Sequence, residues 1–428
     1  MSAALDNAAL INQHKRLAAN FTRNRILSFK VVVIMLMMKG GKSLQLSLNT
    51  LIPKLGLSSR TVSRVAYSKA RSKLKYTFFI ALNQETVVRT MYEDGDYETW
   101  KNMRILGVDG SMVMLPTNDE TVKEFGTIRY DNKQDETKGV GEHSYARASV
   151  LYDVLNRVAL DATLASCRSY EVDLAAEHLK HTQAGDLAIY DRGYASYRMM
   201  ALATRAPGDF LIRCPKDRFP VATSMLSGIG PDDVTVTLTA PAGFTEDTGN
   251  QGLPLMLTVR FVRVTLDNGE YEVLATSLLD QDRFPQADFK TLYYLRWGVE
   301  TFYGILKTRL GLENFSGYSP EAIRQDFHVA VLLTGIESIL AEDAEEQLAG
   351  QLGGHPKKVN KAVSFNSIKE RVFELFMSNA PQDEVLEELT ELFTTTPTLI
   401  RKDRKTPRNH PSSHQVLGWW KRKRKTVF

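Results

Sequence analysis

Strand-like and helix-like segments alternate between residues 103 and 215, and this alternation constrains the fold more than any other feature. Apolar runs typical of strands lie at 103–116, 148–166, 186–193 and 210–215, with a hairpin signal at Leu155-Asn156-Arg157. Helical patterns lie between them, at 169–182 and 196–205. Strands mixed with helices in this order predict an α/β core.

The 428 residues are enough for roughly two to four structural units, and the pattern changes along the chain suggest where they lie. Thr, Val, Gly and Pro with alternating apolar runs at 216–281 predict an antiparallel β insertion, and helical patterns return from 284. The expected regions are helical N-terminal 1–95, core 96–215, β-rich insertion 216–281, core 282–340 with one long helix at 284–310, helical C-terminal 341–400 and basic tail 401–428.

The composition excludes several classes of protein. Hydrophobic residues at 43% and charged residues at 24% are ordinary for a globular chain and exclude a disordered or fibrous one. Two Cys cannot form a disulfide framework or a Cys-rich zinc site, which favours a reducing compartment. The longest apolar run, Val31–Met38, is too short to span a bilayer, so we expect a buried helix, no membrane and a cytoplasmic location.

Basic residues gather in two places although the net charge is only +4. Residues 54–75 hold seven Lys or Arg and no acid, and 401–428 hold ten with one Asp, so a polyanion is the expected partner. The first stretch resembles a helix-turn-helix, with Gly56 as the turn, Ser58 or Ser59 as a helix cap, and Arg60 and Arg64 on one side of the next helix. A plain helical hairpin fits equally well, and the tail is expected to add non-specific affinity.

Two aspartates end strand-like runs, Asp109 in VDG and Asp191 in YDRG. A carboxylate at the end of a buried strand costs several kcal/mol unless a cation or hydrogen bonds satisfy it. Two of them in one α/β core therefore indicate a divalent metal site, for which Mg²⁺ or Mn²⁺ is the preferred ion. The alternative for either residue alone is an ordinary Asp in a turn or helix cap.

Four polar residues follow at helical spacing, namely Tyr293, Arg296, Glu300 and Lys307. Intervals of 3, 4 and 7 residues place them on one face of a helix. Glu300 would complete the metal site, and the two cations would hold phosphates. The alternative is an exposed helix on which Arg296 and Lys307 merely pair with Glu300. Arg192, beside the second aspartate, is a further candidate phosphate contact.

The pattern Y-x2-R-x3-E-x6-K resembles the signature of bacterial insertion-sequence DDE transposases of the insertion sequence four type. LGVDGSMVMLP and GDLAIYDRGYASYRMMALA are similar to the two Asp blocks of that family. The resemblance spans roughly 55–340. It implies a ribonuclease-H-like core in which Asp109, Asp191 and Glu300 bind two divalent cations, and a β-rich insertion before the glutamate.

The resemblance also implies partners and a reaction. The partner would be double-stranded DNA, both terminal inverted repeats and target, with two protomers pairing two ends as a homodimer and cleavage passing through a hairpinned end. Family members use a Trp of the insertion to hold a flipped base, but no Trp lies between Trp100 and Trp297. Phe219, Phe244 or Tyr271 could take its place.

Other motifs lead to weaker hypotheses. KGGKS at 39–43 lacks the Gly that a phosphate loop needs at position 36, so no nucleotide cofactor is expected. His178 and His181 are interpreted as a polar helix end rather than a metal site. Trp419 and Trp420 either stack on bases or anchor the tail on protein.

The sequence therefore predicts a cut-and-paste DNA transposase, in which metal-activated water and then a 3′ hydroxyl attack phosphodiesters. Tyr293, Arg296 and Lys307 are expected to hold the DNA backbone of the transposon end. Two alternatives remain open, a transposase-derived DNA-binding regulator without catalysis and a metal-dependent nuclease that cuts but does not join. The complete Asp/Asp/Glu set argues against the first of these. The same catalytic core could perform the second.

Overall fold

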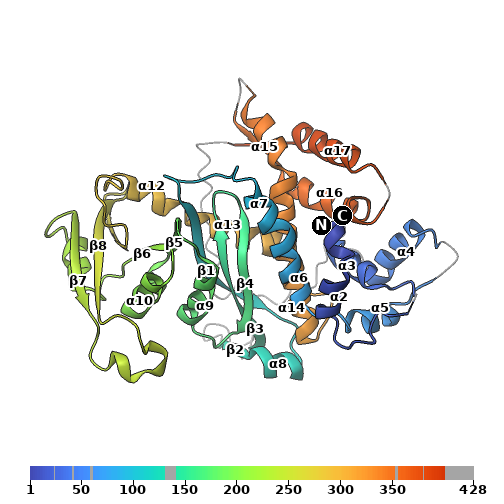
Figure 1. Ribbon diagram of the computed structural model, residues 1–428, viewed down its shortest axis with the longest axis horizontal. Coiled ribbons are helices and arrows are strands. Elements are labelled where there is room, and N and C mark those ends of the chain that lie inside the picture. Colours follow the sequence, from blue (N-terminus) through green and yellow to red (C-terminus); the bar gives the residue numbers. More distant parts are fainter. Residues whose placement is uncertain are drawn as a thin grey trace. The chain divides into compact units, whose positions relative to one another are not determined.

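The chain folds as two compact units in a computed structural model, shown in Figure 1. The structure describes residues 1–23, 25–40, 43–57, 61–130, 141–351, 355–378 and 380–400. The helical unit is formed by Met1–Asp94, Val113–Ala146 and Gly304–Phe428, and the sheet unit by Gly95–Met112 and Arg147–Tyr303. β1 (Arg104–Met114), β3 (Gly141–Asp153) and α13 (Trp297–Thr308) each run from one unit into the other.

Helices dominate the first unit, as the sequence predicts for both ends of the chain. They are α1 (Ser2–Leu5), α2 (Ala8–His14), α3 (Phe29–Met37), α4 (Leu44–Lys54), α5 (Arg64–Arg71), α6 (Thr77–Leu82), the π-helix η1 (Asn83–Val88), α7 (Arg89–Glu93), α8 (Asp119–Phe125), α14 (Pro320–Leu340), α15 (Glu342–Ala349), α16 (Lys361–Phe376) and α17 (Gln382–Thr395). Its strands are β2 (Thr127–Tyr130), paired with the start of β3, and β10 (Lys357–Lys358), paired with β11 (Thr398–Leu399).

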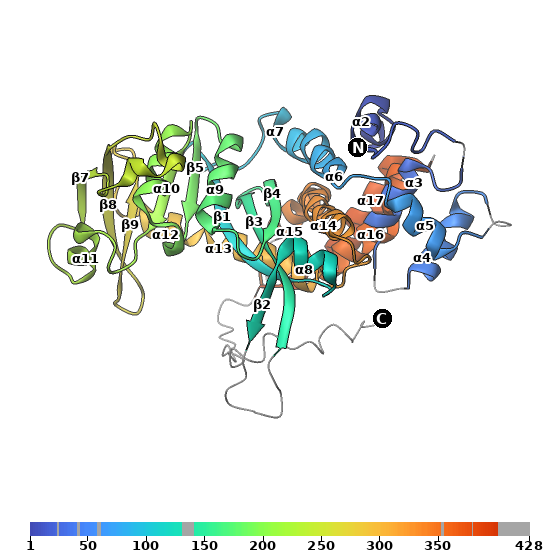
Figure 2. The same cartoon turned by 90° about the horizontal axis from the view of Figure 1, so that it is seen from below.

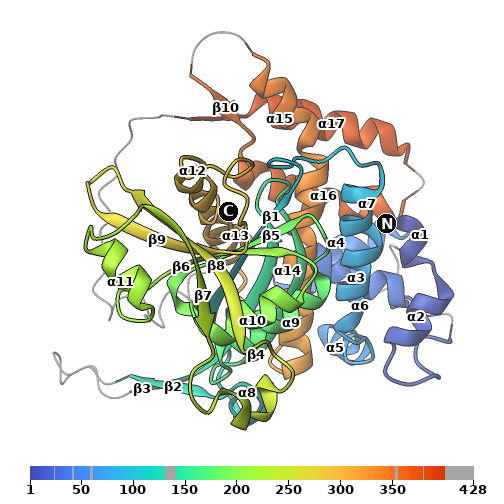
Figure 3. The same cartoon turned by 60° about the vertical axis from the view of Figure 1, so that its left-hand side comes forward.

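The long helix α14 is the centre of the helical unit and packs against α3, α6 and α16 (Figure 3). Almost every residue of α14 from 323 to 338 is buried, so this helix has no exposed polar stripe. The apolar run that begins at Val31 forms the buried helix α3, which confirms that prediction. No helix in the described ranges is long and apolar enough to cross a membrane.

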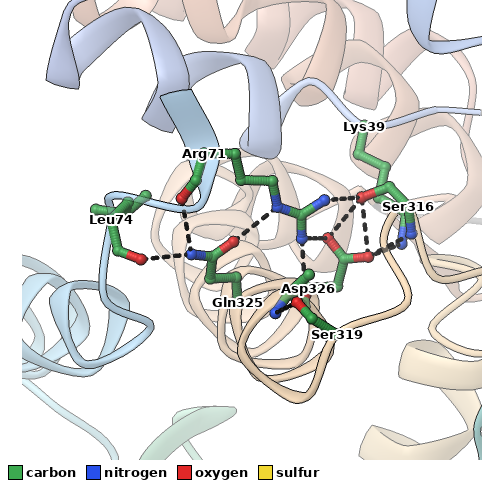
Figure 4. Close-up of polar contacts among 8 residues, drawn as sticks. Lys39, Arg71, Leu74, Ser316, Ser319, Gln325 and Asp326 are labelled. Carbon is green, nitrogen blue, oxygen red and sulfur yellow. Dashed lines mark hydrogen bonds and ion pairs between the residues drawn. The ribbon is translucent and has the colours of Figure 1, made fainter. Parts of the chain in front are cut away.

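A buried ionic network ties α5 to α14 within the helical unit (Figure 4). The Arg71 guanidinium donates to Gln325 Oε1 at 2.7 Å, to Ser316 Oγ at 2.7 Å and to Asp326 Oδ1 at 2.9 Å. The Asp326 carboxylate also accepts from Lys39 Nζ at 3.1 Å and from the Ser316 backbone N–H at 2.6 Å. Burial alone would raise the pKa of Asp326, but these cations and hydrogen bonds outweigh burial and lower the pKa.

The helix-turn-helix region is described only in part, because Ser58, Ser59 and Arg60 lie outside the described residues. Gly56 has the left-handed φ of +72° expected of a turn glycine. Helix α5 begins at Arg64, and its N-cap is Ser63, whose side chain accepts a hydrogen bond from the Ala66 backbone N–H. The basic tail 401–428 also lies outside the described residues.

The sheet unit is mixed α/β, as expected. Its helical segments are α9 (Glu171–His178), η3 (Leu179–His181), η4 (Arg192–Tyr194), α10 (Tyr197–Arg205), α11 (Pro220–Leu226), η5 (Phe244–Glu246), η6 (Thr248–Asn250) and α12 (Asp288–Tyr294). The strands β4 (Val158–Ser166), β5 (Asp186–Tyr190), β6 (Asp209–Arg213), β7 (Asp233–Thr239), β8 (Met256–Thr265) and β9 (Tyr271–Thr276) join β1 and β3. Their order is β3-β1-β5-β6-β9-β8-β7, with β4 beside β3.

Alternate residues of the strands face two helical layers. Ile105, Ile189 and Leu211 form one buried face with Phe289 and Leu292 of α12. The opposite face lies beneath α9 and α10, as Figure 2 shows. Because β1, β5 and β6 are parallel, their carboxyl ends reach the same edge of the sheet.

The stretch 216–281 contains a helix and three antiparallel strands. β9 pairs with β6, β8 with β9, and β7 with β8, so these strands continue the sheet past β6. Alternate residues of these strands are buried and form the core of this region, among them Val259, Phe261 and Val273.

The prediction of a single helix at 284–310 is wrong, because the structure contains two successive helices there, α12 and α13. At the junction the backbone N–H of Arg296 bonds to Tyr293 O, and that of Gly298 bonds to Leu295 O, which are tight three-residue steps. A Cβ on Gly298 would lie 3.0 Å from Val154 Cβ, so α13 begins in close contact with the β3–β4 hairpin. The continuous helical periodicity of the sequence does not register such a tertiary contact.

Candidate active site

The two aspartates lie side by side because of strand register. Val108 of β1 pairs in parallel with Tyr190 of β5, so the next residues on the two strands are Asp109 and Asp191. Successive side chains of a strand alternate between faces, so both aspartates lie on the face where Ile105 and Ile189 meet α12. The Asp109 carboxylate accepts a 2.9 Å hydrogen bond from the Gly110 backbone N–H.

Asp191 is held by two side chains. Its Oδ1 accepts from Tyr293 OH at 3.2 Å and lies 2.8 Å from Arg213 Nη2. Burial would raise the pKa of Asp191, but the hydrogen bond from the Arg192 backbone and the charges of Arg213 and Arg296 outweigh burial and lower the pKa. Asp191 is therefore ionised at neutral pH.

Arg213 connects the second aspartate to strand β9 and was not predicted as a site residue. Its Nη1 lies 2.6 Å from Glu272 Oε1, and its guanidinium lies over the Tyr293 ring, 5.9 Å from the centroid. Arg213 is the last residue of β6, the third parallel strand. A charged residue at that position was the available signal, because parallel strands end at one edge.

Glu300 lies on the first turn of α13 and pairs with Arg296 of the preceding junction. Arg296 Nη2 is 2.8 Å from Glu300 Oε1. The two side chains differ in exposure, because that of Arg296 is 5% exposed and that of Glu300 is 40% exposed. The Arg296–Glu300 pair expected for an exposed helix is thus present. Its arginine, however, is buried rather than exposed to solvent.

The pKa of the Asp109 carboxyl is strongly raised. Burial, with smaller contributions from the negative charges of Glu300 and Asp191, raises the pKa of its carboxyl to about 6 against the opposing effects of the Gly110 hydrogen bond and the Arg296 charge. The charges of the other two carboxylates therefore both act on Asp109, although each of the three has a different hydrogen-bond partner.

Removing this charge should stabilise the metal-free protein at neutral pH. The pKa of Asp109 is about 6 in the folded state against 3.8 ordinarily, so ionisation destabilises the fold progressively between these values. At about 1.4 kcal/mol per pKa unit the penalty reaches up to about 3 kcal/mol above pH 6. In EDTA, Asp109→Asn should melt at a higher temperature than wild type at pH 8, and this difference should vanish near pH 4. An equal melting temperature at both pH values would contradict this prediction.

Several buried donors around the carboxylates lack a hydrogen-bond partner among the described residues. They are Arg147 Nε, Arg213 Nε, Arg296 Nε and Tyr194 OH. Two of these residues, Arg213 and Arg296, line a cavity of about 550 Å³ together with Tyr293 and Trp297. Unpartnered buried donors cost free energy, so the site suits a ligand rich in acceptor oxygens.

The other predicted residues have different surroundings. Arg192 is exposed at the start of η4, directly after Asp191. Lys307 is half-buried near the end of α13, where burial lowers its pKa against the effect of the Glu313 charge. Arg64 is exposed at the start of α5. Tyr293 is the last but one residue of α12 and is only 5% exposed.

The aromatic residues considered for a base pocket also differ. Phe219 and Phe244 are buried, against Phe261 and Tyr197 respectively. Tyr271 is 41% exposed and lies beneath the Arg263 guanidinium. Of these three, Tyr271 is the one open to a ligand.

The carboxylates suit a hard divalent cation in their chemistry. In the described part of the chain, no three His, Cys, Asp or Glu side chains form a ready-made cluster for a metal ion. Asp191 and Glu300 are instead paired with Arg213 and Arg296. Burial, and to a smaller extent repulsion from Glu300 and Asp191, raises the pKa of Asp109, and a bound cation would offset both effects. Oxygen ligands are those that Mg²⁺ and Mn²⁺ prefer.

Known proteins resemble this chain in sequence and in structure. A family model described as a transposase DDE domain matches residues 100–334, more than half of the chain. The structure is similar to that of a piggyBac transposase in a synaptic complex with hairpin DNA, at 10% identity, with 97% of this chain and 86% of that chain covered and a TM-score of 0.39. No protein with a curated description matches the chain.

Proposed function

The chain belongs to the transposase DDE domain family, and we propose that it binds the ends of an insertion sequence and catalyses strand cleavage and strand transfer. Within that family it would be of the insertion sequence four type, with Tyr293, Arg296, Glu300 and Lys307 as its signature. Its core would be ribonuclease-H-like, with 216–281 as the β-rich insertion.

One observation carries this proposal. Asp109 and Asp191 are neighbours by register at the carboxyl edge of parallel strands, and the charge of Glu300 reaches both the first aspartate and Arg296. A structural role would not require two aspartates in a place where burial opposes their ionisation, with a third carboxylate close enough to act on one of them.

The residues have separable roles in the proposed reaction. Asp109, Asp191 and Glu300 would hold two Mg²⁺ ions, with Mn²⁺ able to substitute, after Glu300 turns away from Arg296. Bound metal ions would supply an activated water or 3′ hydroxyl and stabilise charge on the phosphodiester. Arg213 and Tyr293 keep Asp191 ionised and oriented.

The cations supply the DNA contacts. We expect Arg296 and Lys307 to hold phosphates of the transposon end, with Arg192 as a further contact. Arg60 and Arg64 would read the terminal repeat from the N-terminal region. Two protomers would pair two ends, and cleavage would proceed through a hairpinned end.

An excision assay tests this function. A supercoiled plasmid carrying an element with its flanking inverted repeats is incubated with the full-length protein and Mg²⁺. Excised element and a double-strand break at both repeats are the expected products, and EDTA should abolish them. Random nicking that ignores the repeats would favour the nuclease, and binding without any cleavage would favour the regulator.

The phosphate contacts predict a particular salt dependence. Arg296→Ala and Lys307→Ala should each weaken binding to a terminal repeat, and each should lower the slope of log affinity against log salt by about one unit. Fluorescence anisotropy without metal at several salt concentrations measures this slope. Arg371→Ala on α16, where Arg371 pairs with Glu388, is the control and should keep the wild-type slope. Unchanged slopes in both variants would show that these cations serve the protein rather than DNA.

A further inference from the structure

We infer that Glu171, the first residue of α9, is a fourth carboxylate of the proposed metal site and contributes a ligand oxygen beside Asp109. This inference rests on the proposed function, because it adds a ligand to the same metal site. Glu171 lies outside the Asp/Asp/Glu set, and sequence reasoning did not single it out.

The backbone around both aspartates approaches the Glu171 carboxylate. A Cβ on Gly110, directly after Asp109, would lie 3.3 Å from Glu171 Oε1. A Cβ on Gly193, two residues after Asp191, would lie 3.9 Å from Glu171 Oε2. The carboxylate therefore lies beside Gly110 of strand β1 and beside Gly193 of η4, and Gly110 leaves the space that it occupies.

A buried hydroxyl without a partner also points to this place. Tyr194 is 2% exposed, and its OH has no hydrogen-bond partner among the described residues. Tyr194 ends η4, the segment that follows Asp191 and approaches Glu171 at Gly193, and the charges of Asp109 and Glu171 add to the burial that raises the pKa of Tyr194. The hydroxyl of Tyr303, on α13, donates a hydrogen bond to the Asp109 backbone carbonyl at 3.0 Å. Burial raises the pKa of Tyr303, and the charges of Asp109 and Glu171 add to this effect.

The position of Glu171 is fixed by the anchoring of α9. At the other end of this helix His178 Nδ1 lies 2.7 Å from Asp161 Oδ2, and His178 Nε2 lies 2.9 Å from Ser149 Oγ. Both partners are on strands, Asp161 on β4 and Ser149 on β3. A helix held in this way presents its first residue to the sheet edge with little freedom, as a ligand position requires.

Arg147 neutralises the charge of the Glu171 carboxylate in the protein without metal. Its Nη1 forms an ion pair with Glu171 Oε1, and its Nε lacks a partner in the described chain. The Glu171 side chain is 40% exposed, so it can exchange this arginine for a cation. Arg296 has the same relation to Glu300, also at 40% exposure.

Coordination chemistry gives a reason for a fourth carboxylate. Mg²⁺ takes six oxygen ligands in near-octahedral geometry, and two ions cannot be satisfied by three side chains alone. A further protein oxygen would reduce the number of ligands that water and DNA must supply. Loss of Glu171 should therefore weaken binding of one ion more than the other.

Manganese binding to the full-length protein tests this inference. Electron paramagnetic resonance of Mn²⁺ counts bound ions and gives their affinities without DNA cleavage. Glu171→Gln should lower the binding affinity for at least one Mn²⁺ ion by at least about tenfold. Glu177→Gln, the same change on the exposed surface of α9, is the matched control and should bind as wild type does. Far-UV circular dichroism checks that each variant is folded.

Two further variants separate a ligand from a structural partner. If Glu171 served only the ion pair, Arg147→Gln would weaken Mn²⁺ binding as much as Glu171→Gln. If Glu171 is a ligand, Arg147→Gln should leave binding unchanged or tighter, because it removes a competing cation. Gly110→Ala should weaken binding too, because the added methyl group crowds Glu171 Oε1.

The outcomes distinguish this inference from the proposed function. Wild-type binding that is lost in Asp109→Asn and unaffected in Glu171→Gln would overturn the role of Glu171 and leave the three-carboxylate site intact. Absence of Mn²⁺ binding to wild type even at millimolar concentration would overturn both.

Discussion

Replacing Asp109 by Asn, Asp191 by Asn or Glu300 by Gln is expected to abolish DNA cleavage while leaving binding of the terminal repeat intact. Each change keeps the shape of the side chain and removes the negative charge that a cation requires. A metal-assisted step relies on several kcal/mol of charge stabilisation, and about 4 kcal/mol corresponds to about a thousandfold in rate. Cleavage rate and gel shift should be measured on the same preparations in Mg²⁺.

The control for this series is Glu270→Gln, the same chemical change at an exposed position of the sheet unit. It should cleave at the wild-type rate. Wild-type cleavage by any one of the three variants would remove that residue from the metal site. A variant that loses binding as well as cleavage would instead assign its carboxylate to DNA recognition or folding.

Breaking the buried network of the helical unit should be the most destabilising single change outside the active site. Arg71→Ala leaves the Asp326 carboxylate, itself 3% exposed, without its main buried cation. Removing one partner of a buried ion pair typically costs about 3–5 kcal/mol, because the remaining charge stays buried. Urea unfolding of the variant, followed by circular dichroism, should show this loss.

The double variant Arg71→Met with Asp326→Leu identifies the cause. It should be less destabilised than the sum of its single variants, because no unpaired charge remains. Arg89→Ala, which breaks an exposed pair with Glu93, should unfold at the wild-type midpoint. Additive losses in the double variant would mean that the network matters through packing rather than charge.

The alternation of apolar residues explains why the strands around the two aspartates were predictable. The segment 103–116 forms β1, and the run that ends in Asp191 forms β5. Strand periodicity is a local property, so it can be read from a single sequence. The hairpin signal at Leu155-Asn156-Arg157 lies between β3 and β4, where Arg157 has a φ of +59°.

The break between α12 and α13 could not be predicted in the same way. The spacing of Tyr293, Arg296 and Glu300 fits an unbroken helix as well as it fits two helices. The second helix begins where Gly298 packs against Val154, more than a hundred residues earlier in the chain. Such a contact depends on tertiary packing, which residue spacing does not encode.

The residues that lie next to the carboxylates could not be predicted from sequence motifs either. Arg213 reaches Asp191 from β6, and Glu171 reaches Gly110, next to Asp109 on β1, from the start of α9. Neither residue has a helical or strand spacing that relates it to the aspartates. Their proximity follows from the order of strands in the sheet, which is known only once the chain is folded.

A strand-transfer assay tests the central claim most directly. A labelled DNA duplex with a pre-cut terminal repeat is mixed with target plasmid, the full-length protein and Mg²⁺. We predict covalent joining of the labelled 3′ end to the plasmid by wild type, and none by Asp109→Asn although it binds the same end. Cutting of the target without joining, or tight end binding with neither reaction, would contradict the assignment of this chain as an active transposase.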